Sequence, residues 1–221
     1  TFASTLDGAQ GVSINTAGGT YLQAAVGVGS ALTSLTTDAA GTGKTYINGG
    51  VVTTTGAQTY NDPVLLGNAS QETQLNTTNS SVYFAGKLNN VNTSAQALSI
   101  NTGSGNVTLN DAVGDAGAIG SLVINSAGQT SFVSTVDAAS LRTDITGVNV
   151  AAPTNSLVVQ GGRITTSGQQ TYNDPVVVAA ALGSNLFSST AIGDITFNNT
   201  LNGANNVTIN TAGGTYLQAA V

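Results

Sequence analysis

The two ends of this chain carry nearly the same sequence, and this repetition limits the folds that it can adopt. TFASTLDGAQGVSINTAGGTYLQAAV occupies residues 1–26, and TFNNTLNGANNVTINTAGGTYLQAAV occupies residues 196–221, an offset of 195 residues. A second pair of related strings, TTTGAQTYNDPV and TTSGQQTYNDPV, lies at positions 53–64 and 165–176. A chain with such internal repeats is expected to stack similar supersecondary units on one another.

The repeats divide the chain into three copies of one module, each beginning at a phenylalanine. The modules span residues 2–83, 84–196 and 197–221, and the third is truncated. The second module is longer than the first by about 31 residues, more than one unit of a short structural repeat. These extra residues form either a full rung with a loop or an excursion around Asp144 to Asn155. We expect residues 1–221 to form a single continuous domain.

Inside the modules a shorter pattern recurs: an apolar residue, Asn or Thr, a Gly-containing corner, then a short run with Tyr, Phe or Leu. Short, alternating, β-branched runs bounded by Gly and Asn are typical of strands. The sequence therefore predicts an all-β parallel β-helix, or β-solenoid, of about ten rungs of roughly 22 residues. The ten strings lie at Ile14, Thr36, Val52, Leu75, Ile100, Ile124, Ile145, Ile164, Leu186 and Ile209.

The composition agrees with stacked rungs and excludes several function classes. Charged residues make up only 6% of the chain, which suits a solenoid because like charges on neighbouring strands repel. With four Lys and Arg residues and a net charge of −6, the chain has no basic patch for nucleic acid. It has no Cys and no His, so we expect no disulfide, no thiolate metal site and no cofactor. No apolar run is long enough to span a membrane.

The strings INTAGGTYLQAAVG, SLTTDAAGT and INGGVVTTTGAQTYNDPV resemble repeats of filamentous-haemagglutinin-like proteins, which are giant bacterial adhesins of the two-partner secretion type. The resemblance covers essentially the whole chain. It implies a right-handed parallel β-helix that forms part of a long secreted rod on the cell surface. We therefore expect a structural and adhesive role, as a fibre, stalk or sheath. The expected partners are further solenoid repeats at both ends, with cell-surface glycans or neighbouring rods as additional candidates.

Candidate site residues come from the repeated YNDP motif. Tyr60 with Asp62, and Tyr172 with Asp174, could form a surface ladder that binds a glycan or calcium. The alternative is structural: Asn-Asp-Pro is turn chemistry, and the tyrosines could pack in the core. Tyr21 and Tyr216 recur in the other repeated string and raise the same two possibilities.

Catalysis has little support in the sequence, and we expect no enzyme activity. There is no His to act as a base and only one Glu, Glu72, while the nine Asp residues are scattered. Asp111 and Asp115 are the closest pair, and we expect no matching cation nearby. A glycan-binding solenoid is the main alternative to the structural role, and a polysaccharide-cleaving β-helix is the least favoured.

Overall fold

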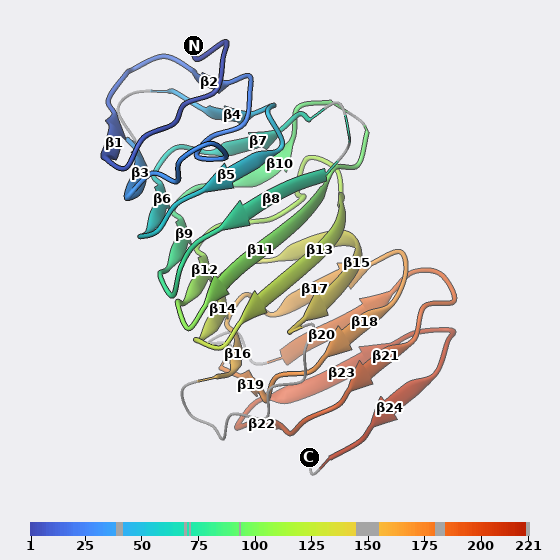
Figure 1. Cartoon of the computed structure of the whole chain (residues 1–221). Helices are drawn as coiled ribbons and strands as arrows, with labels where there is room; N and C mark the ends of the chain where they lie inside the picture. The colour runs from blue at the N-terminus through green and yellow to red at the C-terminus, as the bar shows by residue number, and fades with distance from the viewer. Residues whose placement is uncertain are drawn as a thin grey trace.

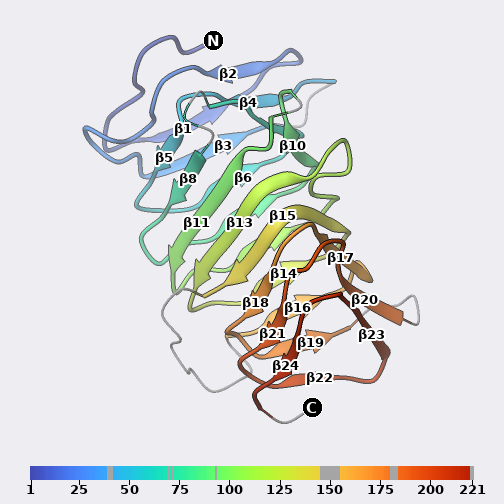
Figure 2. The same cartoon turned by 90° about the vertical axis from the view of Figure 1, so that its right-hand side faces the viewer.

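The computed structural model describes residues 1–38, 42–68, 70, 72–92, 94–144, 155–179 and 184–219. Within these residues the regular elements are all strands, and neighbouring strands pair in parallel. The strands stack from the N-terminal end to the C-terminal end as a β-solenoid (Figure 1; Figure 2). The predicted all-β parallel solenoid is confirmed.

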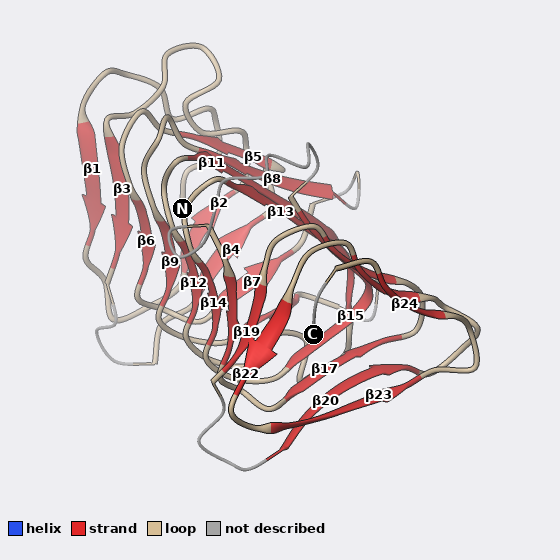
Figure 3. Ribbon diagram, turned by 90° about the horizontal axis from the view of Figure 1, so that it is seen from below, coloured by secondary structure: helices blue, strands red, loops and turns tan. Residues whose placement is uncertain are grey.

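The chain winds round three faces, which we number in the order in which it visits them. Face one is a nine-stranded sheet (Figure 3). Its strands are β1 (Gly11–Ile14), β3 (Ser34–Thr37), β6 (Gln58–Tyr60), β9 (Val82–Phe84), β12 (Val107–Leu109), β14 (Thr130–Phe132), β16 (Leu157–Val159), β19 (Val176–Val178) and β22 (Leu201–Gly203).

Faces two and three follow face one in every turn. Face two holds β2 (Thr20–Leu22), β4 (Thr45–Ile47), β7 (Val64–Leu66), β10 (Leu88–Asn90), the bridge residue Val113, the first half of β15 (Val136–Thr143), β17 (Arg163–Thr166), β20 (Ser184–Ser189) and β23 (Asn206–Asn210). Face three holds the bridge residue Val26, β5 (Val51–Thr53), β8 (Glu72–Asn76), β11 (Ala97–Gly103), β13 (Ile119–Ser126), the second half of β15, β18 (Gln170–Tyr172), β21 (Ile195–Phe197) and β24 (Thr215–Leu217).

The register fixes the number of turns at about eight, not the predicted ten. On face one, eight successive pairings lead from Val12 to Leu201, so each turn is longer than the predicted rung. The sequence-based count assumed one string per turn on a single face. Instead, Ile14 lies on face one, Ile100 on face three and Ile209 on face two. A step from one string to the next would cover three faces if every string lay on the same face. Two of the steps fall one face short, so the nine steps from Ile14 to Ile209 cover eight and one-third turns instead of nine.

The core is a set of apolar columns that run along the solenoid axis. On face three, Val52, Leu75, Ile100 and Ile124 are in register and fully buried. Strands alternate buried and partly exposed positions, as an extended backbone requires, so one residue in two points inward. Burying each of these side chains contributes about 1.5–3 kcal/mol.

The corners between faces need close backbone approach. At Gly27, φ is +71°, and a Cβ atom there would lie 2.0 Å from the carbonyl oxygen of Thr53 in the next turn. A side chain at this position would therefore separate two turns, which explains why glycine occupies this corner.

Neighbouring residues of β13 provide a direct test of this architecture. Ile124 is fully buried in the face-three column, whereas Val123 points outward and is partly exposed. We expect Ile124→Ala to lower the free energy of unfolding by about 2–5 kcal/mol, because it leaves a cavity between two turns. Val123→Ala is the matched control and should cost less than about 1 kcal/mol. Denaturant unfolding followed by circular dichroism measures both, and equal losses would contradict the inward assignment of Ile124.

Candidate functional site

The two tyrosines of the repeated YNDP motif point into the core. Tyr60 and Tyr172 are both 0% exposed. The Tyr60 hydroxyl donates a hydrogen bond to Gln58 Oε1 at 2.9 Å, and the Tyr172 hydroxyl donates to Gln170 Oε1 at 2.7 Å. Burial raises the pKa of both phenols, so they stay neutral and act as donors.

Each buried tyrosine is held by the turns around it. The Gln58 amide donates to the carbonyl oxygen of Asn76 at 3.0 Å, so the Tyr–Gln pair is tied to a neighbouring strand. The Tyr60 ring stacks on Phe84 with ring centroids 4.9 Å apart, and the Tyr172 ring stacks on Phe197 at 4.7 Å. These tyrosines are core residues whose polar ends are satisfied internally.

The two aspartates of the motif are buried at corners. Asp62 is 1% exposed and Asp174 is 3% exposed. Burial raises the pKa of Asp62, with a further contribution from the charge of Asp38. Burial also raises the pKa of Asp174 to about 6, opposed by a hydrogen bond from Thr143.

The predicted surface ladder of Tyr60, Asp62, Tyr172 and Asp174 is therefore wrong. All four side chains are buried, and the two motif copies do not stack, since Tyr60 lies on face one and Tyr172 on face three. The structural alternative, a corner with a core tyrosine, describes both copies.

The asparagine of the motif has a structural role that sequence reasoning did not identify. The Asn61 side chain donates to the carbonyl oxygen of Thr37 at 2.8 Å, and that of Asn173 donates to Thr143 at 2.8 Å. In both copies the amide fastens a corner to the preceding turn. In the first copy the Asn61 backbone N–H donates to the same Thr37 carbonyl oxygen at 3.2 Å, so the side chain reinforces the backbone hydrogen bond at the corner.

Two outward-pointing tyrosines, Tyr21 and Tyr216, lie in the other repeated string. Tyr21 and Tyr46 are register partners on face two, point outward, and stack with ring centroids 4.3 Å apart and planes at 6°. Tyr216, the counterpart of Tyr21, is 45% exposed. Tyr21 and Tyr60 are therefore not equivalent. In the strand TYL the residues on either side of the tyrosine point inward, so the tyrosine points outward. In the strand QTY the tyrosine itself points inward. A shift of one residue along a strand moves a side chain to the opposite face of the sheet.

Two ion pairs in the described part of the chain join neighbouring turns. Lys87 Nζ binds Asp115, whose other oxygen accepts from Asn89 at 2.8 Å. The expectation that Asp111 and Asp115 lack a cation is wrong, because Lys87 comes from the turn before and only the fold brings it near. Arg163 binds Asp137 through two nitrogens at 2.7 and 2.8 Å. Among the described residues no three Asp, Glu, His or Cys side chains are grouped as a metal site.

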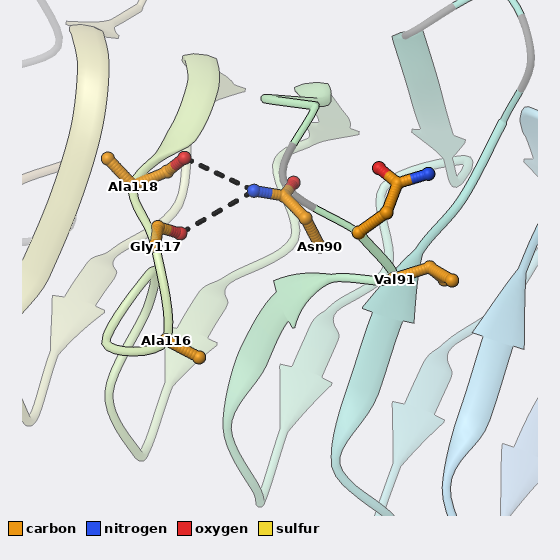
Figure 4. Close-up of a pocket in the computed structure, with 6 residues that line it drawn as sticks. Asn90, Val91, Ala116, Gly117 and Ala118 are labelled. Carbon is orange, nitrogen blue, oxygen red and sulfur yellow. Dashed lines mark hydrogen bonds between the residues drawn. The ribbon is translucent and has the colours of Figure 1, made fainter.

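A groove of about 430 Å³ opens at a corner beside face two (Figure 4). The amides that line it are already engaged. Asn90 Nδ2 donates to the carbonyl oxygen of Ala118 at 3.1 Å, and Asn90 Oδ1 accepts from the Gln96 backbone. Asn92 Oδ1 accepts from the Ser94 backbone. Both polar atoms of the Asn90 amide and the side-chain oxygen of Asn92 are therefore already occupied by contacts within the chain.

Comparisons with protein-family models, with curated proteins and with solved structures each find no match to this chain. Across the part of the chain that the structure describes, there is no helix long and apolar enough to cross a membrane.

The buried carboxyl of Asp174 predicts a pH-dependent stability. Its pKa of about 6 in the folded state lies above the ordinary value of 3.8, so the folded state binds this proton more tightly than the unfolded state. Stability from this group is therefore lost as the pH rises from about 4 to 6. We expect Asp174→Asn to raise the free energy of unfolding at pH 8 by about 2–3 kcal/mol and to change it little at pH 4.

Asp7→Asn is the control of opposite sign. Asp7 accepts hydrogen bonds from the backbone of Gly29 and Ser30, which lower its pKa, so its carboxylate stabilises the fold at neutral pH. Denaturant unfolding at both pH values measures the two variants. A loss of stability for Asp174→Asn at pH 8 would show that the buried carboxylate is not a liability.

Proposed function

We propose that the chain is a rod segment of a large, secreted, repetitive bacterial surface protein, with a structural and adhesive role as part of a fibre, stalk or sheath. The observation that carries the proposal is the continuous register of all three faces from the first turn to the last. A solenoid built from near-identical modules can be lengthened without a new kind of contact. The sequence resemblance to filamentous-haemagglutinin-like repeats supports the same role.

The outer surface of face one supports a passive role. One outward residue from each strand of this face belongs to a register column that contains no charge. The column consists of Ser13, Thr36, Thr59, Tyr83, Thr108, Ser131, Val158, Val177 and Asn202. Hydroxyl and β-branched residues suit a long pleated surface, and their repetition avoids like-charge contacts between turns.

The two ends of the solenoid support extension by further turns. Phe2, Leu6, Val12 and Ile14 at one end, and Val207 and Ile209 at the other, pack on the core but remain only partly buried. Strand β24 is exposed along its whole length. Unpaired parallel edges over an open apolar interior are sites for further strands.

End-to-end association tests this extension. Leu217, on the last strand of face three, is 47% exposed. We expect Leu217→Lys to weaken self-association of the chain at least about tenfold, because a charge would be buried between stacked ends. Ile192→Lys is the matched control, since Ile192 is 82% exposed in a corner before β21 rather than on a terminal strand. Sedimentation velocity measures both, and equal association constants would exclude stacking through this end.

Localisation tests the surface role. Immunogold labelling with antibodies against this chain should decorate intact, unpermeabilised cells that produce the protein. Labelling only after permeabilisation would overturn the proposal.

Glycan binding is the second candidate function, and the outward stack of Tyr21 and Tyr46 favours it, because aromatic side chains are common in sugar sites. If it is correct, Tyr21→Ala with Tyr46→Ala abolishes binding to a glycan array. The control is Tyr83→Ala, a partly exposed tyrosine on face one. Absence of any array signal from the unaltered chain would exclude this function.

Polysaccharide cleavage has the weakest support. Asp115 and Asp137 are held in ion pairs, and Asp62 and Asp174 are buried. We therefore propose a non-enzymatic role, which release of reducing ends from a polysaccharide by the chain would contradict.

A further inference from the structure

The three module copies begin on three different faces of the solenoid. Phe2 bridges to Leu22 on face two, Phe84 lies in β9 on face one, and Phe197 lies in β21 on face three. The chain visits the faces in the order one, two, three, so each module begins one face behind the module before it. The sequence repeats, but its orientation round the axis does not.

The local structure of a module is kept although its face changes. Phe2 pairs with Leu22, and Phe197 pairs with Leu217, at the same separation along the sequence. The ring of Tyr21 lies over Gly19, where a Cβ atom would be 2.8 Å from the ring. The ring of Tyr216 lies over Gly214 in the same way, at 2.5 Å. Each copy therefore folds as its own sequence directs, whichever face it occupies.

The rotation follows from the number of faces that a repeat spans. From Phe2 to Phe84 the chain passes eleven faces, and from Phe84 to Phe197 it passes fourteen. The extra residues of the second module therefore include one complete turn; the expected excursion falls on residues 145–154, which lie outside the described residues. The 195-residue repeat spans twenty-five faces, or eight and one-third turns, and so cannot return to its starting face.

The C-terminal edge is built to accept the next part of the repeat in this rotated position. Leu201, Val207 and Leu217 are the counterparts of Leu6, Val12 and Leu22. In the first copy those three residues pair with Val26, Leu35 and Ile47 of the following turn. The equivalents of Leu35 and Ile47 in a following segment would therefore fit the terminal edge, each one face further round the axis.

We propose that this edge, formed by β22, β23 and β24, is the docking surface for the continuation of the repeat, a segment equivalent to residues 27–47. Each 195-residue repeat is thereby turned by one face, about a third of a turn. Any surface feature of the repeat returns to the same side of the rod only at every third copy. This inference rests on the proposed function as a rod segment.

The rotation determines what kind of partner the rod fits. The stacked pair Tyr21–Tyr46 points outward from face two, whereas Tyr216 points outward from face three. A rod of such repeats presents each feature in three directions in turn, so it has no single binding side. This display fits contact with like rods on all sides, as in a bundle or sheath.

Cysteine pairs in the full chain test the rotation, because the chain has no cysteine of its own. Register neighbours in parallel strands lie about 4.8 Å apart, within the range for a disulfide. Ser131 pairs with Val158, and Val158 pairs with Val177, in the outward column of face one. We expect Ser131→Cys with Val158→Cys, and Val158→Cys with Val177→Cys, to form disulfides on mild oxidation.

The decisive comparison is Ser131→Cys with Thr171→Cys. Thr171 is the repeat counterpart of Thr59, which lies on face one, but Thr171 itself lies on face three. If Thr171 instead kept the face of Thr59, with residues 144–155 looped out between two turns, it would be the face-one neighbour of Ser131 and this pair would form the disulfide. Its formation would overturn the inference, as would failure of both expected pairs.

The control separates this inference from the proposed function. Thr36→Cys with Thr59→Cys joins register neighbours that lie before the second module in either arrangement. If this pair fails, the solenoid and the rod proposal fail together. If it forms while Ser131→Cys with Thr171→Cys also forms, only the rotation is wrong.

The array itself can be viewed directly. In a chain of four copies of residues 1–195 followed by 196–221, Thr59→Cys in each copy can carry a small gold cluster. Eight and one-third turns at about 4.8 Å a turn place successive clusters about 40 Å apart along the axis. Electron microscopy should show clusters on one side of the rod at every third position only. Clusters from every copy along one side would overturn the inference.

Discussion

The structure depends on in-register pairing of parallel strands along one axis. Each turn donates and accepts backbone hydrogen bonds with the turns above and below, so every side chain lies on its counterpart about 4.8 Å away. This constraint explains the composition. Like apolar residues form continuous inward columns, like hydroxyls form outward columns, and charges are rare because they would face their own kind. The two described ion pairs join positions in different turns, where opposite charges can meet.

The same constraint lets one sequence occupy any face. A strand of three residues needs only two inward positions, a partner above and below, and corners that permit close approach. Aromatic stacking illustrates this: Tyr60 on Phe84 and Tyr172 on Phe197 have nearly the same separation and the same angle of 17°, although one pair lies on face one and the other on face three. Because local sequence directs local conformation, the repeat need not contain a whole number of turns, and this one does not.

Buried polar groups mark where stacking is specified rather than merely allowed. Gln58 and Gln170 lie inside the solenoid. The side-chain oxygen of each accepts a hydrogen bond from the hydroxyl of a buried tyrosine, and its side-chain nitrogen donates one to a backbone carbonyl oxygen of a neighbouring strand. A slip of register would leave these groups without partners, at a cost of about 1–3 kcal/mol for each unsatisfied group. The motif that most resembled a ligand site is instead a device that fixes the position of one turn on the next.

The sequence was sufficient to predict the fold class, since short alternating runs, Gly and Asn corners and a short regular period admit stacked strands and little else. It also determined that the two copies of each string would share a local conformation. The tertiary structure alone decided which face each copy occupies, whether Tyr60 points in while Tyr21 points out, and that Lys87 reaches Asp115. The reason is that spacing fixes local geometry to within a residue or two, whereas a one-residue shift reverses a side chain and a corner longer by a few residues moves a whole strand round the axis.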